Sequence, residues 1–97
     1  MSYFTYILYS EKFDCYYYGQ TQDLEVRLSK HNSGFVKSSA RYLPWKLYAC
    51  KEFSTRSQAF SMERKLKNCK GRMRMLEFIT REEFTVLGSQ EVFGPEK

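Results

Sequence analysis

Three ionisable side chains occupy faces where helical patterns in the sequence place apolar residues. In residues 24–31, Arg27 and His31 share the i, i+3, i+4, i+7 face with two leucines. In a later helical pattern over residues 56–70, Glu63 lies at the edge of the apolar stripe. Burying an unpaired charged group is unfavourable, so each of these positions needs either a bonding partner or a function.

An arginine, a histidine and a glutamate together are suited to phosphoryl chemistry. A carboxylate holds a divalent cation, a guanidinium binds phosphoryl oxygens and an imidazole moves protons. A structural alternative is that Glu63 pairs with Arg27 while His31 bonds a backbone carbonyl. That alternative suffices for any one of these residues. The three together, beside a tyrosine cluster and a basic run, favour the functional interpretation.

The stretch YYYGQT at residues 16–21 supplies further candidates. Side chains alternate across a strand, so we expect Tyr17 to face the site while Tyr16 and Tyr18 pack on the other face. Gly19 permits close backbone approach because it has no Cβ. A free tyrosine has a pKa of about 10, so a tyrosine base at neutral pH requires a nearby cation or help from His31.

The positive charge is concentrated in one segment. The chain has a net charge of +5, and residues 63–74 hold six cations and one anion. One dominant sign suggests a polyanionic partner such as nucleic acid, because cations that neutralise phosphates release counterions. A merely solvated basic face is the alternative. In addition to Gly19, the candidate nucleic-acid contacts are Lys37, Arg41, Arg64, Lys67 and Lys70.

Length and composition limit the remaining choices. A chain of 97 residues is sufficient for one domain, which we place at residues 1–87, followed by a polar tail over 88–97. No apolar run approaches the roughly 20 residues of a membrane span. The N-terminus lacks the pattern of a signal peptide, so a cytoplasmic protein is expected. The three cysteines have neither disulfide-framework nor metal-site spacing.

Periodicity predicts three strands, over residues 3–9, 15–20 and 45–53. In the third strand, Trp45, Leu47, Ala49 and Phe53 alternate on one side, with Trp45 in the core. The first two strands form a hairpin by proximity. These strands predict a small, three-stranded, mainly antiparallel sheet.

Helix signals separate and follow these strands. Asp23 is an N-cap for a helix to about Asn32, and Thr55 with Gln58 forms a capping box for a helix over 56–70. Residues 72–79 have a helical pattern, and a further capping box at Thr80 predicts a short helix through residue 87. The order β-β-α-β-α-α with a short C-terminal helix defines an α+β domain, its sheet flanked by helices.

Five segments of this sequence resemble the GIY-YIG nuclease domain in order and approximate spacing. They are TYIL at 5–8, YYG at 17–19, LEVRLSKHNSG at 24–34, PWKLYACKEF at 44–53 and SMERKLK at 61–67. The resemblance covers about residues 3–75. It is closest to small stand-alone bacterial members, akin to the nuclease domain at the start of the UvrC excision-repair subunit.

The resemblance implies a metal-dependent DNA endonuclease, with a role in DNA repair or recombination. It implies one Mg²⁺ or Mn²⁺ ion, for which Glu63 is the protein ligand. Phe4 and Thr5 replace the Gly and Ile of the family's first tripeptide, and Tyr18 replaces the Ile of the second. The catalytic residues that the resemblance implies are Tyr6, Tyr17, Arg27, His31 and Glu63.

Two other classes of function stay open at this point. A non-catalytic nucleic-acid binding module would keep the same fold and the basic helix. A protein-interaction domain would need a large exposed apolar patch, which the sequence does not show. For Tyr6 and Tyr17, ordinary sheet packing is the structural alternative. Four further questions are open: the structure of the substrate, whether it is DNA or RNA, which residue is the general base, and whether the protein is a monomer or a homodimer.

Overall fold

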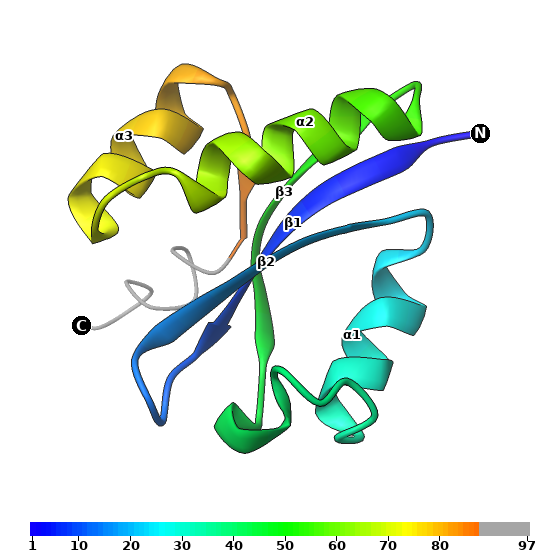
Figure 1. The fold of residues 1–97 in the computed structure, drawn as a ribbon, viewed down its shortest axis with the longest axis vertical. Helices are drawn as coiled ribbons and strands as arrows, with labels where there is room; N and C mark the ends of the chain where they lie inside the picture. Colours follow the sequence, from blue (N-terminus) through cyan, green and yellow to red (C-terminus); the bar gives the residue numbers. More distant parts are fainter. Residues whose placement is uncertain (88–97) are drawn as a thin grey trace.

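The structure, a computed structural model, describes residues 1–87. The predicted tail over 88–97 lies outside the described residues. The fold is α+β, as predicted, with helices on both faces of one antiparallel sheet (Figure 1). The elements in chain order are β1 (Tyr3–Ser10), β2 (Cys15–Thr21), α1 (Leu24–Asn32), a 3₁₀ turn η1 (Ala40–Tyr42), β3 (Lys46–Phe53), α2 (Arg56–Lys67), α3 (Arg72–Arg81) and β4 (Thr85–Val86).

The sheet has four strands in the order β2-β1-β3-β4, rather than the three predicted. The expected short helix after Thr80 is wrong. Instead α3 runs through Thr80, whose hydroxyl donates to the Leu76 carbonyl at 2.9 Å and so cannot cap a new helix. The chain then turns at Glu83, and Thr85–Val86 pairs with β3. Threonine and valine are β-branched, which suits a strand.

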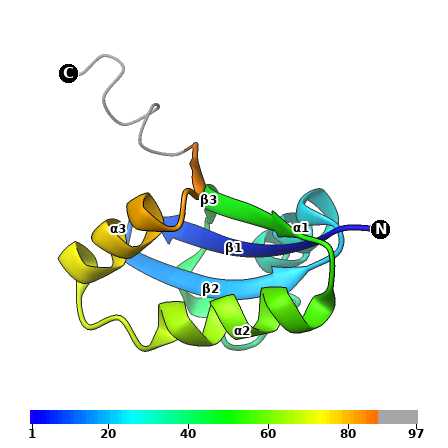
Figure 2. The same cartoon turned by 90° about the horizontal axis from the view of Figure 1, so that it is seen from above.

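The predicted starts of α1 and α2 are confirmed. The Asp23 carboxylate accepts from the backbone of α1, and both hydrogen bonds of the Thr55–Gln58 capping box are formed at α2. The end of α2 was predicted three residues too late. Its last turn tightens, because the Cys69 amide donates to the Leu66 carbonyl at 3.0 Å, an i→i−3 bond. Residues 68–71 therefore form a link between α2 and α3 (Figure 2).

The expected one-sided alternation in β3 is wrong because the strand contains a bulge. Ile7 of β1 pairs with Ala49, but the next residue, Leu8, pairs with Leu47, so Tyr48 is the extra residue. The extra residue moves the later side chains of β3 to the opposite face. Leu47 accordingly packs on the α1 side of the sheet, whereas Ala49 packs on the α2 side.

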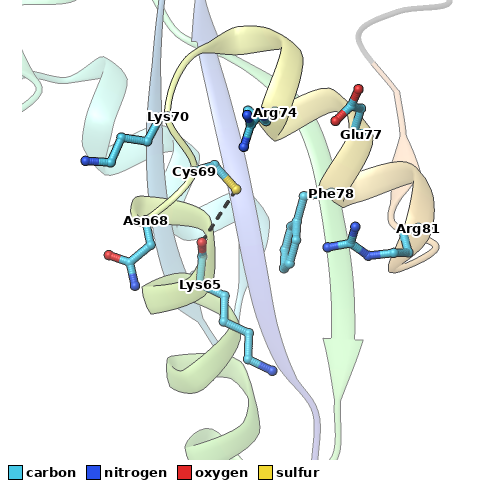
Figure 3. A pocket seen from close by; sticks show the side chains of 8 residues that line it. All are labelled: Lys65, Asn68, Cys69, Lys70, Arg74, Glu77, Phe78 and Arg81. Carbon is cyan, nitrogen blue, oxygen red and sulfur yellow. Dashed lines mark hydrogen bonds between the residues drawn. The ribbon is translucent and has the colours of Figure 1, made fainter.

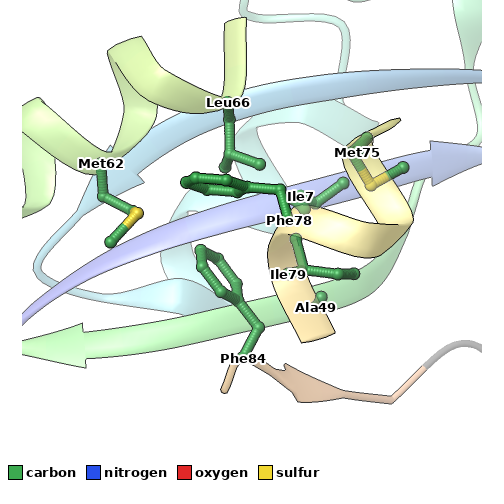
Figure 4. Packing of buried hydrophobic residues seen from close by; sticks show 8 residues of the cluster. All are labelled: Ile7, Ala49, Met62, Leu66, Met75, Phe78, Ile79 and Phe84. Atoms are coloured by element: carbon green, nitrogen blue, oxygen red, sulfur yellow. The ribbon is translucent and has the colours of Figure 1, made fainter. Parts of the chain in front are cut away.

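The two faces of the sheet have separate apolar clusters. On the face of α2 and α3, eight buried residues interlock: Ile7, Ala49, Met62, Leu66, Met75, Phe78, Ile79 and Phe84 (Figure 4). On the face of α1, the buried cluster is Tyr6, Leu8 and Trp45. Tyr16 and Tyr18 pack on the first cluster and Tyr17 on the second, which confirms the predicted alternation. The core position of Trp45 is confirmed too.

Within residues 1–87, no helix is long and apolar enough to cross a membrane.

Candidate active site

The buried Tyr6 of β1 joins two of the predicted site residues. Its hydroxyl accepts a hydrogen bond from Arg27 Nε at 3.2 Å and lies 2.9 Å from His31 Nε2. Both partners come from α1, one turn apart. The structural alternative for these residues, a Glu63–Arg27 pair with His31 on a backbone carbonyl, is not what the structure shows.

The direction of this hydrogen-bond chain follows from its donors. An arginine only donates, so the Tyr6 oxygen accepts from Arg27. Because the Ser39 hydroxyl donates to a backbone carbonyl, its oxygen is left to accept from His31 Nδ1, and this assigns His31 Nε2 as the acceptor of the Tyr6 proton. A neutral imidazole that accepts at Nε2 has its proton on Nδ1. That proton points to Ser39 Oγ at 2.6 Å, and Ser39 donates in turn to the Val36 carbonyl at 3.3 Å. The chain therefore leads from a half-buried arginine to a part-buried backbone carbonyl.

Burial holds this chain in its neutral form. His31 is fully buried, and desolvation, followed by the nearby positive charge of Arg27, lowers the pKa of its imidazole to about 4. Desolvation also raises the pKa of Tyr6, and the opposing hydrogen bond from Arg27 does not cancel it. At neutral pH the imidazole is uncharged and the phenol keeps its proton.

Gly19 of β2 makes room for the Tyr6 side chain. A Cβ at Gly19 would lie 2.6 Å from Tyr6 Cζ, and closer still to the hydroxyl. The two residues face each other across the β1–β2 pair. Gly19 was predicted as a nucleic-acid contact, and its packing shows a different use of the missing side chain. It lets the hydroxyl of Tyr6 lie against the backbone of β2, an edge strand of the sheet.

We expect Gly19→Ala to lower the free energy of unfolding by about 1–3 kcal/mol, because Tyr6 is buried and cannot move aside. A double-mutant cycle with Tyr6→Ala, followed by chemical denaturation, checks the cause. In the Tyr6→Ala background the cost of the added methyl group should disappear. Equal costs in both backgrounds would show that the contact with Tyr6 is not what excludes a side chain at residue 19.

Tyr17 lies on the other side of the imidazole. Its ring meets the His31 ring edge-on with centroids 4.7 Å apart, and its hydroxyl is 3.3 Å from Ser38 Oγ. Tyr17 therefore contacts His31 from the side of β2 that was expected to face the site. Unlike the buried Tyr6 hydroxyl, that of Tyr17 ends at an exposed serine.

The loop between α1 and β3 contributes residues that the sequence did not reveal. Ser38 and Ser39 bond Tyr17 and His31, respectively. The loop is fixed from both ends: Asn32 Oδ1 accepts from the Trp45 amide at 2.6 Å, and Trp45 Nε1 donates to the Ser39 carbonyl at 3.0 Å. A serine pair between Gly34 and Pro44 was the only available signal, and it is typical of any polar loop.

Glu63 reaches the site from α2. Its side chain is 13% exposed and accepts from Lys67 Nζ at 2.8 Å, one turn further along the helix. The negative charge of Glu63 adds to the causes, led by burial, that raise the pKa of Tyr6. The pKa of Lys67 is raised chiefly by its bond to Glu63, and also by the field of Tyr17. The charge of Glu63 thus acts on Tyr6, and that of Lys67 interacts with Tyr17.

The donor set at Glu63 fits one hard cation held mainly by other ligands. Within residues 1–87 no three His, Cys, Asp or Glu side chains gather as a metal site. A lone carboxylate suits Mg²⁺ or Mn²⁺, which keep several waters and take further oxygen ligands from a phosphate substrate. Lys67 holds the Glu63 carboxylate at 2.8 Å, so a metal ion at Glu63 would share the carboxylate with this lysine.

The remaining predicted nucleic-acid contacts lie on exposed parts of the surface. Lys37 and Arg41 are in the α1–β3 loop, and Lys70 is in the α2–α3 link. Arg64 lies on the outer face of α2, with its guanidinium 5.9 Å from the centre of the Phe60 ring. No contact in the structure tests a role for these four cations, and they stay predictions.

Comparison with known proteins identifies the family of this chain. The model of the GIY-YIG catalytic domain matches residues 2–76, which is most of the chain. The chain belongs to the GIY-YIG family. This is a family of nuclease domains, and the sequence resemblance is confirmed.

Two relatives are similar to this chain over more than half of its length. The UPF0213 protein YsiG of Lactococcus lactis is 48% identical over 63 residues, covering 63% of this chain and 59% of that protein. The solution structure of the UPF0213 protein BH0048 from Bacillus halodurans is 27% identical. It matches with a TM-score of 0.50 and covers 82% of this chain and 84% of that one.

Proposed function

We propose that this protein is a metal-dependent endonuclease that hydrolyses phosphodiester bonds in DNA. The observation that carries the proposal is the hydrogen-bonded chain from Arg27 through Tyr6 to His31, together with the Glu63–Lys67 pair on α2, where the charge of Glu63 acts on Tyr6. Such a chain has a phosphate-binding group at one end and a proton acceptor at the other. A role in repair or recombination and a cytoplasmic location belong to the same proposal.

Arg27 would position the substrate. Its Nε is bonded to Tyr6, while the rest of the half-buried guanidinium group is placed to fork onto the oxygens of a phosphate. The arginine therefore holds the scissile phosphate at a fixed position relative to the Tyr6 hydroxyl. Fixing two reacting groups relative to each other removes a large part of the entropic barrier.

Tyr6 would transfer the proton of the attacking water. As the water oxygen bonds to phosphorus, its proton would pass to the Tyr6 oxygen and the phenolic proton to His31 Nε2. The phosphorus–oxygen bond to the leaving group would break, and the leaving oxygen would take a proton from a second water molecule. Ser39 holds the other imidazole nitrogen, so the ring stays oriented to accept. A divalent cation held by Glu63 would neutralise the charge that develops on the phosphate. Lys67 is placed to add a second positive charge.

One observation favours the alternative of a nucleic-acid binding module. Glu63 is already paired with Lys67, and a carboxylate satisfied by a lysine has no need of a metal ion. On that alternative, the pair would be structural, and the basic surface would bind DNA without turnover.

The experiment that tests the proposal is cleavage of supercoiled plasmid and of labelled branched, single-stranded and RNA substrates, with Mg²⁺, Mn²⁺ or EDTA. We expect DNA cleavage that EDTA abolishes and that Arg27→Ala reduces by at least about a hundredfold. Lys12→Ala, which removes one cation from the exposed β1–β2 turn, is the matched control and should cleave normally. DNA binding without cleavage on every substrate would reject the nuclease and favour the binding module.

A further inference from the structure

A basic hollow lies between the C-terminal end of α2, the link over 68–71, and α3, with a volume of about 530 Å³ (Figure 3). Four of its lining residues are cations and only one is a carboxylate. The lining residues are Lys65, Asn68, Cys69, Lys70, Arg74, Glu77, Phe78 and Arg81.

The hollow has an apolar floor and a basic rim. Phe78, which is 9% exposed, lies at its centre, and the side chains of Lys65, Arg74 and Arg81 surround it (Figure 3). The Arg81 guanidinium is 5.5 Å from the centre of the Phe78 ring, which fixes one side of the rim. The charged groups therefore come from two helices and converge on one space.

Most of this positive charge is not neutralised by the fold. In the same basic segment, Lys67 is paired with Glu63, and Arg72 with Asp14. Lys65 and Arg74, by contrast, form no ion pair with any residue of the described part of the chain, and neither does Lys70. Uncompensated cations around a concave surface raise the local concentration of anions.

The hollow and the candidate active site lie on opposite flanks of α2. At 3.6 residues per turn, Glu63 and Lys67 are on one side of the buried stripe of α2, and Lys65 is on the other. An α-helix with its side chains is about 10–12 Å across. At about 3.4 Å per nucleotide of one strand, that width corresponds to roughly three nucleotides. Arg64 is exposed on the outer face of α2 between the two places.

We propose that this hollow binds the phosphate backbone of a nucleic-acid strand at least about three nucleotides away from the part of the strand that lies at Glu63. The identity of the polymer rests on the proposed function. The strand would cross the outer face of α2 at Arg64 and enter the hollow at Lys65 and Arg74. Backbone phosphates carry no base information, so this contact adds affinity without choosing sequence. It gives a one-domain nuclease a second binding site for its substrate.

The test compares wild type with Lys65→Ala, Arg74→Ala and the double variant in DNA-binding titrations from 0.05 to about 0.2 M salt. Each lost phosphate contact should reduce the slope of log K against log salt by about 0.9, and should weaken binding roughly tenfold near 0.1 M. Lys12→Ala is the control for a lost surface charge. Lys65 and Arg74 are exposed, so thermal unfolding of the variants should match that of wild type.

Two further readouts separate this site from the reaction centre and from a site for small anions. Single-turnover cleavage at saturating DNA should be unchanged in the double variant, because the hollow touches no reacting atom. Acetylation of Lys65 and Lys70 should be blocked by DNA but not by millimolar inorganic phosphate. Equal protection by phosphate alone would overturn a strand-binding role in favour of a small-anion site.

The outcomes keep the two proposals distinguishable. If the protein cleaves DNA but the double variant binds DNA with the affinity and salt slope of wild type, the hollow does not bind the strand and the proposed nuclease function is unaffected. Weaker binding in the double variant of a protein that never cleaves would support the hollow and reject the nuclease.

Discussion

Glu63→Gln is expected to reduce metal-dependent DNA cleavage by at least about a thousandfold, which corresponds to a loss of ~4 kcal/mol of transition-state stabilisation. Glutamine keeps the size of the side chain and one acceptor oxygen, but it has no charge with which to hold a cation. The side chain is only 13% exposed, so water replaces the lost ligand poorly. Initial rates over a range of Mg²⁺ and Mn²⁺ concentrations measure the effect.

DNA affinity separates this loss of catalysis from a loss of fold. Removing a negative charge beside the basic run should leave DNA binding equal or tighter, since the positive charge of Lys67 is then unopposed. Glu25→Gln makes the same chemical change at an exposed position in the first turn of α1 and should cleave normally. Full activity in Glu63→Gln would show that Glu63 and Lys67 form a structural pair.

Local signals in the sequence were sufficient to predict most helices and strands. The caps at Asp23 and Thr55 are set by side chains within a few residues, so their consequences can be read without the fold. The bulge at Tyr48 and the strand at Thr85–Val86 depend instead on pairing with β1 and β3. A two-residue strand has no stability of its own, and its sequence alone did not reveal it.

The membership of the candidate site was easier to predict than its bonding. A histidine and an arginine on an otherwise apolar helix face mark a site because burial demands a partner. Which partner they take depends on distant parts of the chain. His31 bonds Tyr6, 25 residues away, and Ser39 in an irregular loop. Strand register and loop closure determine both contacts, and neither is set by local spacing.

Tyr6→Phe is expected to reduce cleavage by about 10²–10⁴-fold, the usual contribution of a proton-transfer group. Phenylalanine keeps the ring that packs beneath Gly19 but removes the acceptor for Arg27 and the donor to His31. The buried His31 Nε2 is then unsatisfied, which should also lower the free energy of unfolding by about 1–3 kcal/mol. Tyr9→Phe is the matched control, because the Tyr9 hydroxyl bonds Asp14 at an exposed position.

The acid limb of the pH–rate profile tests the same chain in wild type. A protonated His31 has no acceptor for the Tyr6 proton, so cleavage should fall with a midpoint near pH 4 rather than at the ordinary histidine value of about 6.5. The folded pKa lies below the unfolded one, so the unfolded chain binds the proton first as pH falls. The stability contributed by a neutral His31 is therefore complete above pH 6.5 and is lost as pH falls through about 4.

One histidine in the whole sequence makes this prediction directly measurable. Its imidazole resonances report His31 alone, and they should show a proton on Nδ1 at neutral pH and a titration near pH 4. If the imidazole instead titrates near 6.5, or its proton lies on Nε2, Tyr6 cannot donate to it as the chain requires. The proton of the attacking water would then need another acceptor, and Tyr17, the other tyrosine against the imidazole, would be the residue to replace next.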